Sequence, residues 1–194
     1  MDVLKSNFPS FLREIIDQKD LEKHIPEIIH SFSFLELEKN QFLVQKGSVC
    51  DFFCFIESGV LQHSIDIIED EKTTYLALKN SCTSALKSFL QKTPSRKNIK
   101  ALVNSSLWVI RVDSFHSLMK NNPAFYTFYF NLIERQIFLI DDYRIDLLTL
   151  TPVERYKKLL QNEPKLLSEV PLHYLASFLG ISKRHMSRIR KKTK

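Results

Sequence analysis

Six short β-rich runs between residues 41 and 112 constrain the fold of this chain more than any other feature. They are rich in β-branched and aromatic residues, and turn signals such as Gly47 and Gly59 separate them. Strands spaced this closely predict a barrel or sandwich rather than βαβ units. A helical turn is expected within Ser84–Gln91. The predicted strands are Gln41–Gln45, Phe52–Glu57, Val60–Ile68, Thr73–Leu78, Ile99–Val103 and Leu107–Val112.

Helical patterns flank these strands on both sides. Pro9 and Asp20 are start signals for two helices within residues 8–32. The pattern becomes helical again at Ser114, and from Pro123 to Leu148 it continues without a break. At ~1.5 Å per residue this last segment would form a rod ~39 Å long.

One face of the long segment is apolar over its whole length. Its residues recur every three or four positions, which is the spacing of helices that pack along a seam. We expect one side to pack on the barrel and the other on a second copy of the chain. A single helix covered within one chain is the alternative. The expected dimer contacts are Tyr126, Phe130, Ile133, Ile137, Ile140 and Leu147.

A helix restart signal follows the long segment. Thr151-Pro-Val-Glu154 combines a capping box with proline at the first helical position. We therefore place a domain boundary at residues 149–151. The apolar residues expected to face inward on the next helix are Val153, Tyr156, Leu159 and Leu160.

The last part of the chain predicts two short helices joined by a tight turn. Apolar residues from Leu172 to Leu179 recur at helical spacing. Gly180 suits a left-handed turn because it has no Cβ, and Ser182 can cap a second helix. A helix-turn-helix that lays a cationic helix in the major groove has this pattern, and so does an ordinary helical hairpin. The expected inner face of the second helix is Ile181, Met186 and Ile189.

Positive charge is concentrated on that second helix. The chain carries 28 Lys and Arg against 22 Asp and Glu, a formal net charge of +6. Seven of the basic residues and none of the acidic ones lie within residues 183–194, so the rest is close to neutral. A local cationic end on a neutral chain is expected of a site that binds a polyanion. The expected DNA-binding residues are Ser182, Lys183, Arg184, His185, Ser187, Arg188, Arg190 and Lys191.

No catalytic or metal site is predicted. The six histidines are scattered without metal-ligand spacing, and the three cysteines include no CxxC pair. A phosphate-cradling glycine loop and a nucleophile elbow are missing, so neither an enzyme nor a cofactor is expected. The sequence also lacks an apolar signal segment and an 18-residue apolar span. These features predict a cytoplasmic protein with no membrane partner.

Two stretches resemble the cyclic-AMP receptor protein and fumarate-nitrate regulator (Crp/Fnr) family of bacterial transcription regulators. Leu43–Val60, with the sequence LVQKGSVCDFFCFIESGV, resembles the β-roll signature of that family. The region from Thr151 onward resembles its helix-turn-helix domain. The order of parts agrees over nearly the whole chain. The three glycines all fall where the family needs a backbone turn, at Gly47, Gly59 and Gly180.

The resemblance implies an α+β fold in three parts. Residues 1–122 would form a sensor domain, a double-stranded β-helix or jelly roll of the cyclic-nucleotide-binding type with N-terminal helices. Residues 123–148 would form the central dimerisation helix, and residues 149–194 the helix-turn-helix domain.

The resemblance also implies which residues read the DNA. Lys183, Arg184 and Arg188 would contact bases, while Ser182, His185, Arg190 and Lys191 would meet phosphates. The family often has an acidic residue at the place of Arg184. An arginine donates to guanine where an acid accepts from cytosine, so we expect a different target sequence.

The effector pocket departs from the family pattern. Cyclic-nucleotide binders use a glycine-glutamate pair for the ribose and an arginine for the phosphate. Here those places fall on Ser84-Ala85 and Ser95, with Arg96 next to the latter. Without the carboxylate the ribose loses its charge-assisted partner, so cyclic AMP is not the expected effector. Too few thiolates are present for an iron–sulfur sensor.

These patterns predict a homodimeric, sequence-specific DNA-binding regulator with a degenerate sensor domain. An unknown small-molecule effector and RNA polymerase are its possible partners beside DNA. The alternative is a small-molecule-binding module that binds no specific DNA.

Overall fold

The computed structural model describes residues 6–68, 70–162 and 166–192. Two four-stranded antiparallel sheets form a β-roll, so the barrel or sandwich prediction is confirmed. The first sheet has the order β1-β8-β3-β6. Its strands are β1 (Ser33–Leu37), β8 (Ser105–Arg111), β3 (Phe52–Ser58) and β6 (Cys82–Thr83).

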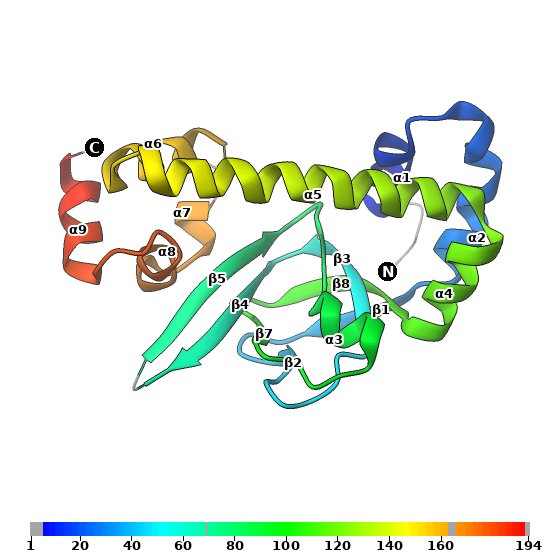
Figure 1. Ribbon diagram of the computed structural model, residues 1–194, viewed down its shortest axis with the longest axis horizontal. Coiled ribbons are helices and arrows are strands. Elements are labelled where there is room, and N and C mark those ends of the chain that lie inside the picture. Colours follow the sequence, from blue (N-terminus) through cyan, green and yellow to red (C-terminus); the bar gives the residue numbers. More distant parts are fainter. Residues whose placement is uncertain (1–5, 69, 163–165, 193–194) are drawn as a thin grey trace.

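The second sheet has the order β2-β7-β4-β5. Figure 1 shows β4 and β5 as a long hairpin that extends to the lower left. Its strands are β2 (Phe42–Val44), β7 (Asn98–Ala101), β4 (Val60–Ile67) and β5 (Asp70–Leu78).

All six predicted runs are strands, but two further strands were missed. β1 carries the sequence SFLEL, which has no β-branched residue and no clear alternation. β6 is only two residues long and exists because Cys54 and Phe55 of β3 pair with it. Pairing with a distant strand, not local propensity, stabilises both.

Three helical segments precede the roll: α1 (Phe8–Ile16), the 3₁₀ helix η2 (Lys19–His24) and α2 (Ile25–His30). Pro9 lies in the first turn of α1, as predicted. The expectation that Asp20 caps a helix leading to Ile25, Ile28 and Ile29 is wrong, because Asp20 lies inside η2, which has no side-chain cap, and α2 begins at Ile25. Pro26 explains the break, because it has no N–H to donate to the carbonyl of residue 22.

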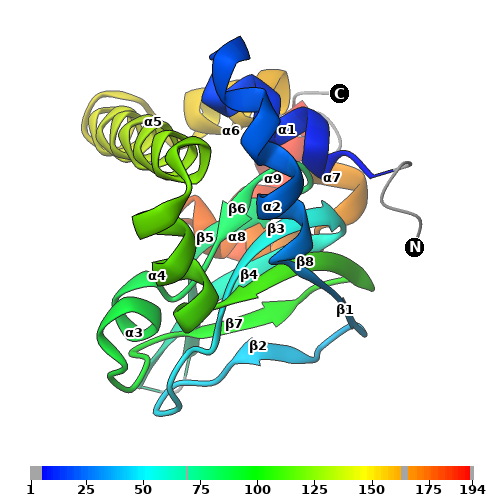
Figure 2. The same cartoon turned by 90° about the vertical axis from the view of Figure 1, so that its right-hand side faces the viewer.

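The remaining helices of the roll are α3 (Leu86–Gln91) and α4 (Val112–Asn121), which begins slightly before the expected Ser114. The long helix α5 (Pro123–Thr149) matches the predicted segment within one residue. Figure 2 shows α1, α2, α4 and α5 gathered on one side of the two sheets. Aromatic rings fill this layer, with Phe8 5.0 Å from Phe55 and Phe115 5.2 Å from Phe125 between ring centroids.

Among the described residues, four helices follow α5: α6 (Pro152–Asn162), α7 (Leu166–Glu169), α8 (Leu172–Phe178) and α9 (Lys183–Lys192). The capping box is confirmed, because Glu154 Oε2 accepts from Thr151 Oγ1 at 2.7 Å and from Thr151 N at 2.8 Å. Tyr156 is buried as predicted, but Val153 is 38% exposed, so its inward placement was wrong. The packed face of α6 begins only at Tyr156, where α6 joins the second apolar cluster.

The C-terminal helices pack on the outer face of the β4–β5 hairpin. Val60, Leu76 and Leu102 of the roll belong to one buried cluster with apolar residues of α6, α7, α8 and α9. The C-terminal part therefore packs directly on the roll. It shares a core with the second sheet.

Glu57 binds Ser6 and Asn7, which precede α1, to the roll. Its buried carboxylate accepts from Asn7 N at 2.9 Å, Asn7 Nδ2 at 2.7 Å and Trp108 Nε1 at 3.2 Å, and also from Ser6. Burial by itself raises the pKa of Glu57, but these hydrogen bonds outweigh burial and hold the pKa below its ordinary value of 4.5.

We expect Glu57→Gln to lower the free energy of unfolding by about 2–3 kcal/mol at pH 7, because it removes a charge-assisted acceptor. The carboxylate stabilises the fold above its unfolded pKa, and this contribution is lost as pH falls through the lowered folded pKa. The difference between variant and wild type should therefore shrink in urea titrations at pH 3. Glu36→Gln, on an exposed position of β1, is the control. A difference that stays constant with pH would contradict this assignment.

Candidate nucleic-acid interface

The turn between α8 and α9 is built by local hydrogen bonds. Gly180 has φ +69°, and its N donates to Ser177 O at 3.1 Å, while Ile181 N donates to Ala176 O at 3.0 Å. This is the Schellman arrangement that ends a helix on a left-handed glycine. Ser182 then caps α9, because its Oγ accepts from His185 N at 3.1 Å.

The two faces of α9 differ sharply in burial and charge. Met186 and Ile189 are buried with Ala176 of α8 in the second apolar cluster, and Ile181 is half-buried against it, in agreement with the predicted inner face. On the outer face only His185 is half-buried. The other predicted DNA-binding residues are exposed, namely Ser182, Lys183, Arg184, Ser187, Arg188, Arg190 and Lys191.

The cations of this outer face are available to a ligand. Within the described ranges, no carboxylate forms an ion pair with any of them. Ser187 differs, because its hydroxyl donates to Lys183 O at 3.0 Å and so can offer a ligand only its acceptor lone pairs. The structure thus brings the predicted residues together on one exposed cationic helix face.

Two residues that sequence reasoning did not single out as structural supports hold the turn in place. Arg155 of α6 donates to Leu150 O at 2.7 Å and to Leu179 O at 3.2 Å. Tyr143 of α5 donates to Phe178 O at 2.9 Å, and its ring stacks on Phe178 at 5.4 Å. Both partners are backbone carbonyls, for which the sequence carries no signal.

The apolar stripe of α5 is uncovered over most of its length. The first third of the helix is buried through Ala124, Phe125 and Phe128. Beyond it the stripe faces outward, and of the six expected dimer contacts only Ile133 is half-buried. The exposed fractions are 55% for Tyr126, 57% for Phe130, 57% for Ile137, 59% for Ile140 and 43% for Leu147.

The four expected effector residues do not converge on one open site. Ser84, Ala85 and Ser95 are buried, whereas Arg96 is exposed. The Ser84 hydroxyl donates to Phe52 O at 2.9 Å and that of Ser95 to Lys97 O at 2.7 Å. Their hydrogen-bonding capacity is thus used within the roll, and Ala85 has no polar group.

A polar cluster inside the roll was missed. His63 is 2% exposed, and its Nε2 lies 2.7 Å from Thr83 Oγ1, while its Nδ1 has no partner among the described residues. Tyr75 meets the imidazole edge-on at 5.3 Å. Burial and then the Lys97 ammonium hold the pKa of His63 well below its ordinary value, so the ring is neutral near pH 7. Strand alternation could have placed His63 inside, on the same face as Leu61.

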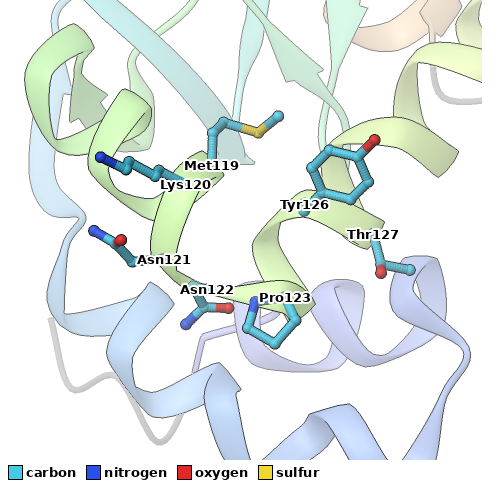
Figure 3. Close-up of a pocket in the computed structure, with 7 residues that line it drawn as sticks. All are labelled: Met119, Lys120, Asn121, Asn122, Pro123, Tyr126 and Thr127. Carbon is cyan, nitrogen blue, oxygen red and sulfur yellow. The ribbon is translucent and has the colours of Figure 1, made fainter.

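A shallow surface pocket of about 320 Å³ lies at the corner between α4 and α5, away from these residues. Figure 3 shows Met119 and Lys120 of α4 and Tyr126 and Thr127 of α5 around it, with Asn122 and Pro123 at the corner. Tyr126 also belongs to the exposed apolar stripe. No group of three His, Cys, Asp or Glu side chains in the described ranges is placed to hold a metal ion.

Comparison with known proteins agrees with this geometry. Residues 34–122 match the family model of the cyclic nucleotide-binding domain. No curated protein sequence matches the chain significantly.

Solved structures extend the likeness to the rest of the chain. FixK2 from Bradyrhizobium japonicum has a TM-score of 0.71 at 11% identity, over 83% of each chain. CLP from Xanthomonas campestris, a c-di-GMP-responsive global regulator, has a TM-score of 0.65 at 15% identity, over 88% of this chain and 90% of its own. A regulator of the Crp/Fnr family from Eubacterium rectale has a TM-score of 0.65 at 15% identity, over 90% and 82%.

The chain has the Crp/Fnr fold. The resemblance inferred from Leu43–Val60 and from the C-terminal helices is thereby confirmed at the level of architecture. The residues that match the family model form the roll, and the helices that follow complete the fold. Among the described helices, none is both long and apolar enough to cross a bilayer.

Proposed function

We propose that the protein is a homodimeric, sequence-specific DNA-binding transcription regulator. The observation that carries this proposal is the outer face of α9, a capped helix whose exposed cations form no ion pair with a described carboxylate while its inner face is buried. A helix of this kind after a tight turn is suited to enter the major groove as the second helix of a helix-turn-helix. Lys183, Arg184 and Arg188 would contact bases, and arginine at these places favours guanine.

Dimerisation would come from α5. The exposed stripe has heptad spacing: Tyr126, Ile133, Ile140 and Leu147 recur every seven residues, and Phe130 and Ile137 lie between them, as along a seam between two packed helices. Pairing two copies in this way would present two recognition helices. A two-fold related DNA site with half-sites ~34 Å apart is expected.

The sensor domain would not respond to cyclic AMP. Ala85 stands where a carboxylate would bind the ribose, and Ser95 where an arginine would bind the phosphate. The roll interior instead offers a neutral His63 beside Lys97, so an effector, if the protein uses one, has different chemistry. A regulator of this kind acts in the cytoplasm and meets RNA polymerase at its target promoters.

Selection of binding sites from random double-stranded DNA by the purified protein tests the proposal. Recovery of a palindromic sequence with half-sites one helical turn apart is the expected result. Equally weak binding to all duplexes would contradict it. In that case the roll would be a small-molecule-binding module without specific DNA binding.

Two substitutions on α9 should separate base reading from phosphate contact. Arg188→Ala is expected to relax base preference at one position and to weaken binding to the selected site by about 1–3 kcal/mol. Lys191→Ala should instead weaken binding to all duplexes alike. It should also reduce the slope of log K against log salt concentration by about one. Titrations against the selected site and a scrambled duplex at several salt concentrations measure both effects. The reverse outcome would show that the register of the helix in the groove is different.

A further inference from the structure

The free edge of the second sheet is covered by α8. β5 is the last strand of that sheet, so one side of its backbone has no strand partner. Ser177 of α8 takes this place, because its Oγ accepts from Thr73 N at 2.9 Å and lies 3.5 Å from Glu71 O. One hydroxyl therefore serves two backbone groups of an edge strand that would otherwise be unpaired.

The next residue of α8 is held from the other side. The Phe178 carbonyl accepts from Tyr143 of α5, and the two rings stack. Consecutive residues thus contact two different parts of the molecule, β5 through Ser177 and α5 through Phe178. Figure 1 shows α8 beside β5 and immediately before α9. A displacement of β5 relative to α5 must move α8 or break one of these contacts.

Further contacts surround the Ser177 bond. Lys100 of β7 lies 3.1 Å from both carboxylate oxygens of Glu71 and 5.5 Å from the centre of the Tyr174 ring of α8. The apolar side of the junction is the cluster shared by Val60, Leu76 and Leu102 with the C-terminal helices. The junction therefore has both a polar and an apolar component.

Two buried polar atoms at the same junction lack hydrogen-bond partners within the described ranges. Gln62 Oε1 and Ser64 Oγ lie on the face of β4 that carries Val60, are buried, and have no hydrogen-bond partner among the described residues. A buried polar atom without a partner destabilises the arrangement that buries it. Water would satisfy both atoms if α8 moved away, so the junction is weaker than the core of the roll.

We propose that Ser177 is a positioning residue whose bond to the edge of β5 orients the recognition helix relative to α5, and that this contact opens without unfolding the roll. We call the contact of Ser177 with Thr73 and Glu71 the edge clasp. Through it, a change at β4 and β5 reaches α9. This inference rests on the proposed function for its DNA-reading role. The existence of the clasp does not depend on that function.

Amide hydrogen exchange in the full-length protein tests the clasp itself. The Thr73 amide should exchange more slowly than a free edge amide but faster than the His63 amide of the central strand β4. Ser177→Ala should speed exchange at Thr73 by about tenfold, the effect of one lost hydrogen bond. Ser177→Thr, which keeps the hydroxyl, should restore protection. Ser31→Ala, whose hydroxyl bonds Glu27 O in α2, is the control. Equal Thr73 exchange in wild type and Ser177→Ala would overturn the inference.

The ratio of operator to non-operator affinity tests the positioning role. Ser177→Ala should lower this ratio by about tenfold, because two recognition helices that are no longer oriented lose preorganisation. Affinity for non-operator DNA should stay unchanged, because every cation of α9 remains. Loss of Thr73 protection with an unchanged ratio would overturn the positioning role. A wild type that selects no sequence would refute the regulator and the reading role together, while the exchange result would still decide whether the clasp exists.

Discussion

Ile137→Asp is expected to dissociate the proposed α5 dimer into monomers. Ile137 lies in the middle of the exposed stripe of α5, and two-fold symmetry would place two new carboxylates in one apolar seam. Loss of two buried side chains and burial of two like charges should raise the dimer dissociation constant by at least about a thousandfold. Sedimentation equilibrium measures this change directly.

Loss of the dimer should also remove most of the affinity for a palindromic operator, because one helix-turn-helix can occupy only one half-site. The matched control is Ile68→Asp, which makes the same substitution at a residue that is 96% exposed on the β4–β5 hairpin. The control should keep both the dimer and the operator affinity. If Ile137→Asp dimerised with wild-type affinity, the stripe of α5 would not be the dimer contact.

Gly59→Ala is expected to lower the free energy of unfolding by at least about 3 kcal/mol. Gly59 has φ +96°, where a residue with a Cβ is strained. A Cβ would also lie 2.7 Å from Ser105 Cα, a backbone atom of β8. β8 pairs with strands on both sides and cannot yield without disturbing the first sheet. In a domain of this size the melting temperature should fall by roughly 6–12 °C.

Gly47→Ala separates the backbone strain from the steric contact with Ser105. Gly47 has φ +91°, but no atom lies within 4 Å of a Cβ built there. We expect only the backbone strain, about 1–2 kcal/mol. Chemical denaturation of both variants measures the difference. Equal losses would show that the contact with Ser105 is relieved by small shifts.

The candidate site followed from the sequence to an unusual extent because its signals are local. The capping serine at Ser182, the turn glycine at Gly180 and the alternation of apolar and basic residues on α9 all act within a few positions of one another. The expected effector residues did not rest on local signals of this kind. Ser84 and Ser95 were aligned from a family pattern, but their hydroxyls bond backbone carbonyls that no sequence pattern reveals.

The sequence by itself determined six of the strands, the long helix α5, the turns at its three glycines and the cationic face of α9. These features depend on periodicity, capping and backbone freedom, which are properties of neighbouring residues. Only the tertiary structure decided that β1 and β6 are strands, that Gly59 is crowded where Gly47 is free, and that Ser177 bonds to Thr73. Each of these depends on a partner far away in the chain, and such a partner comes near only when the roll closes.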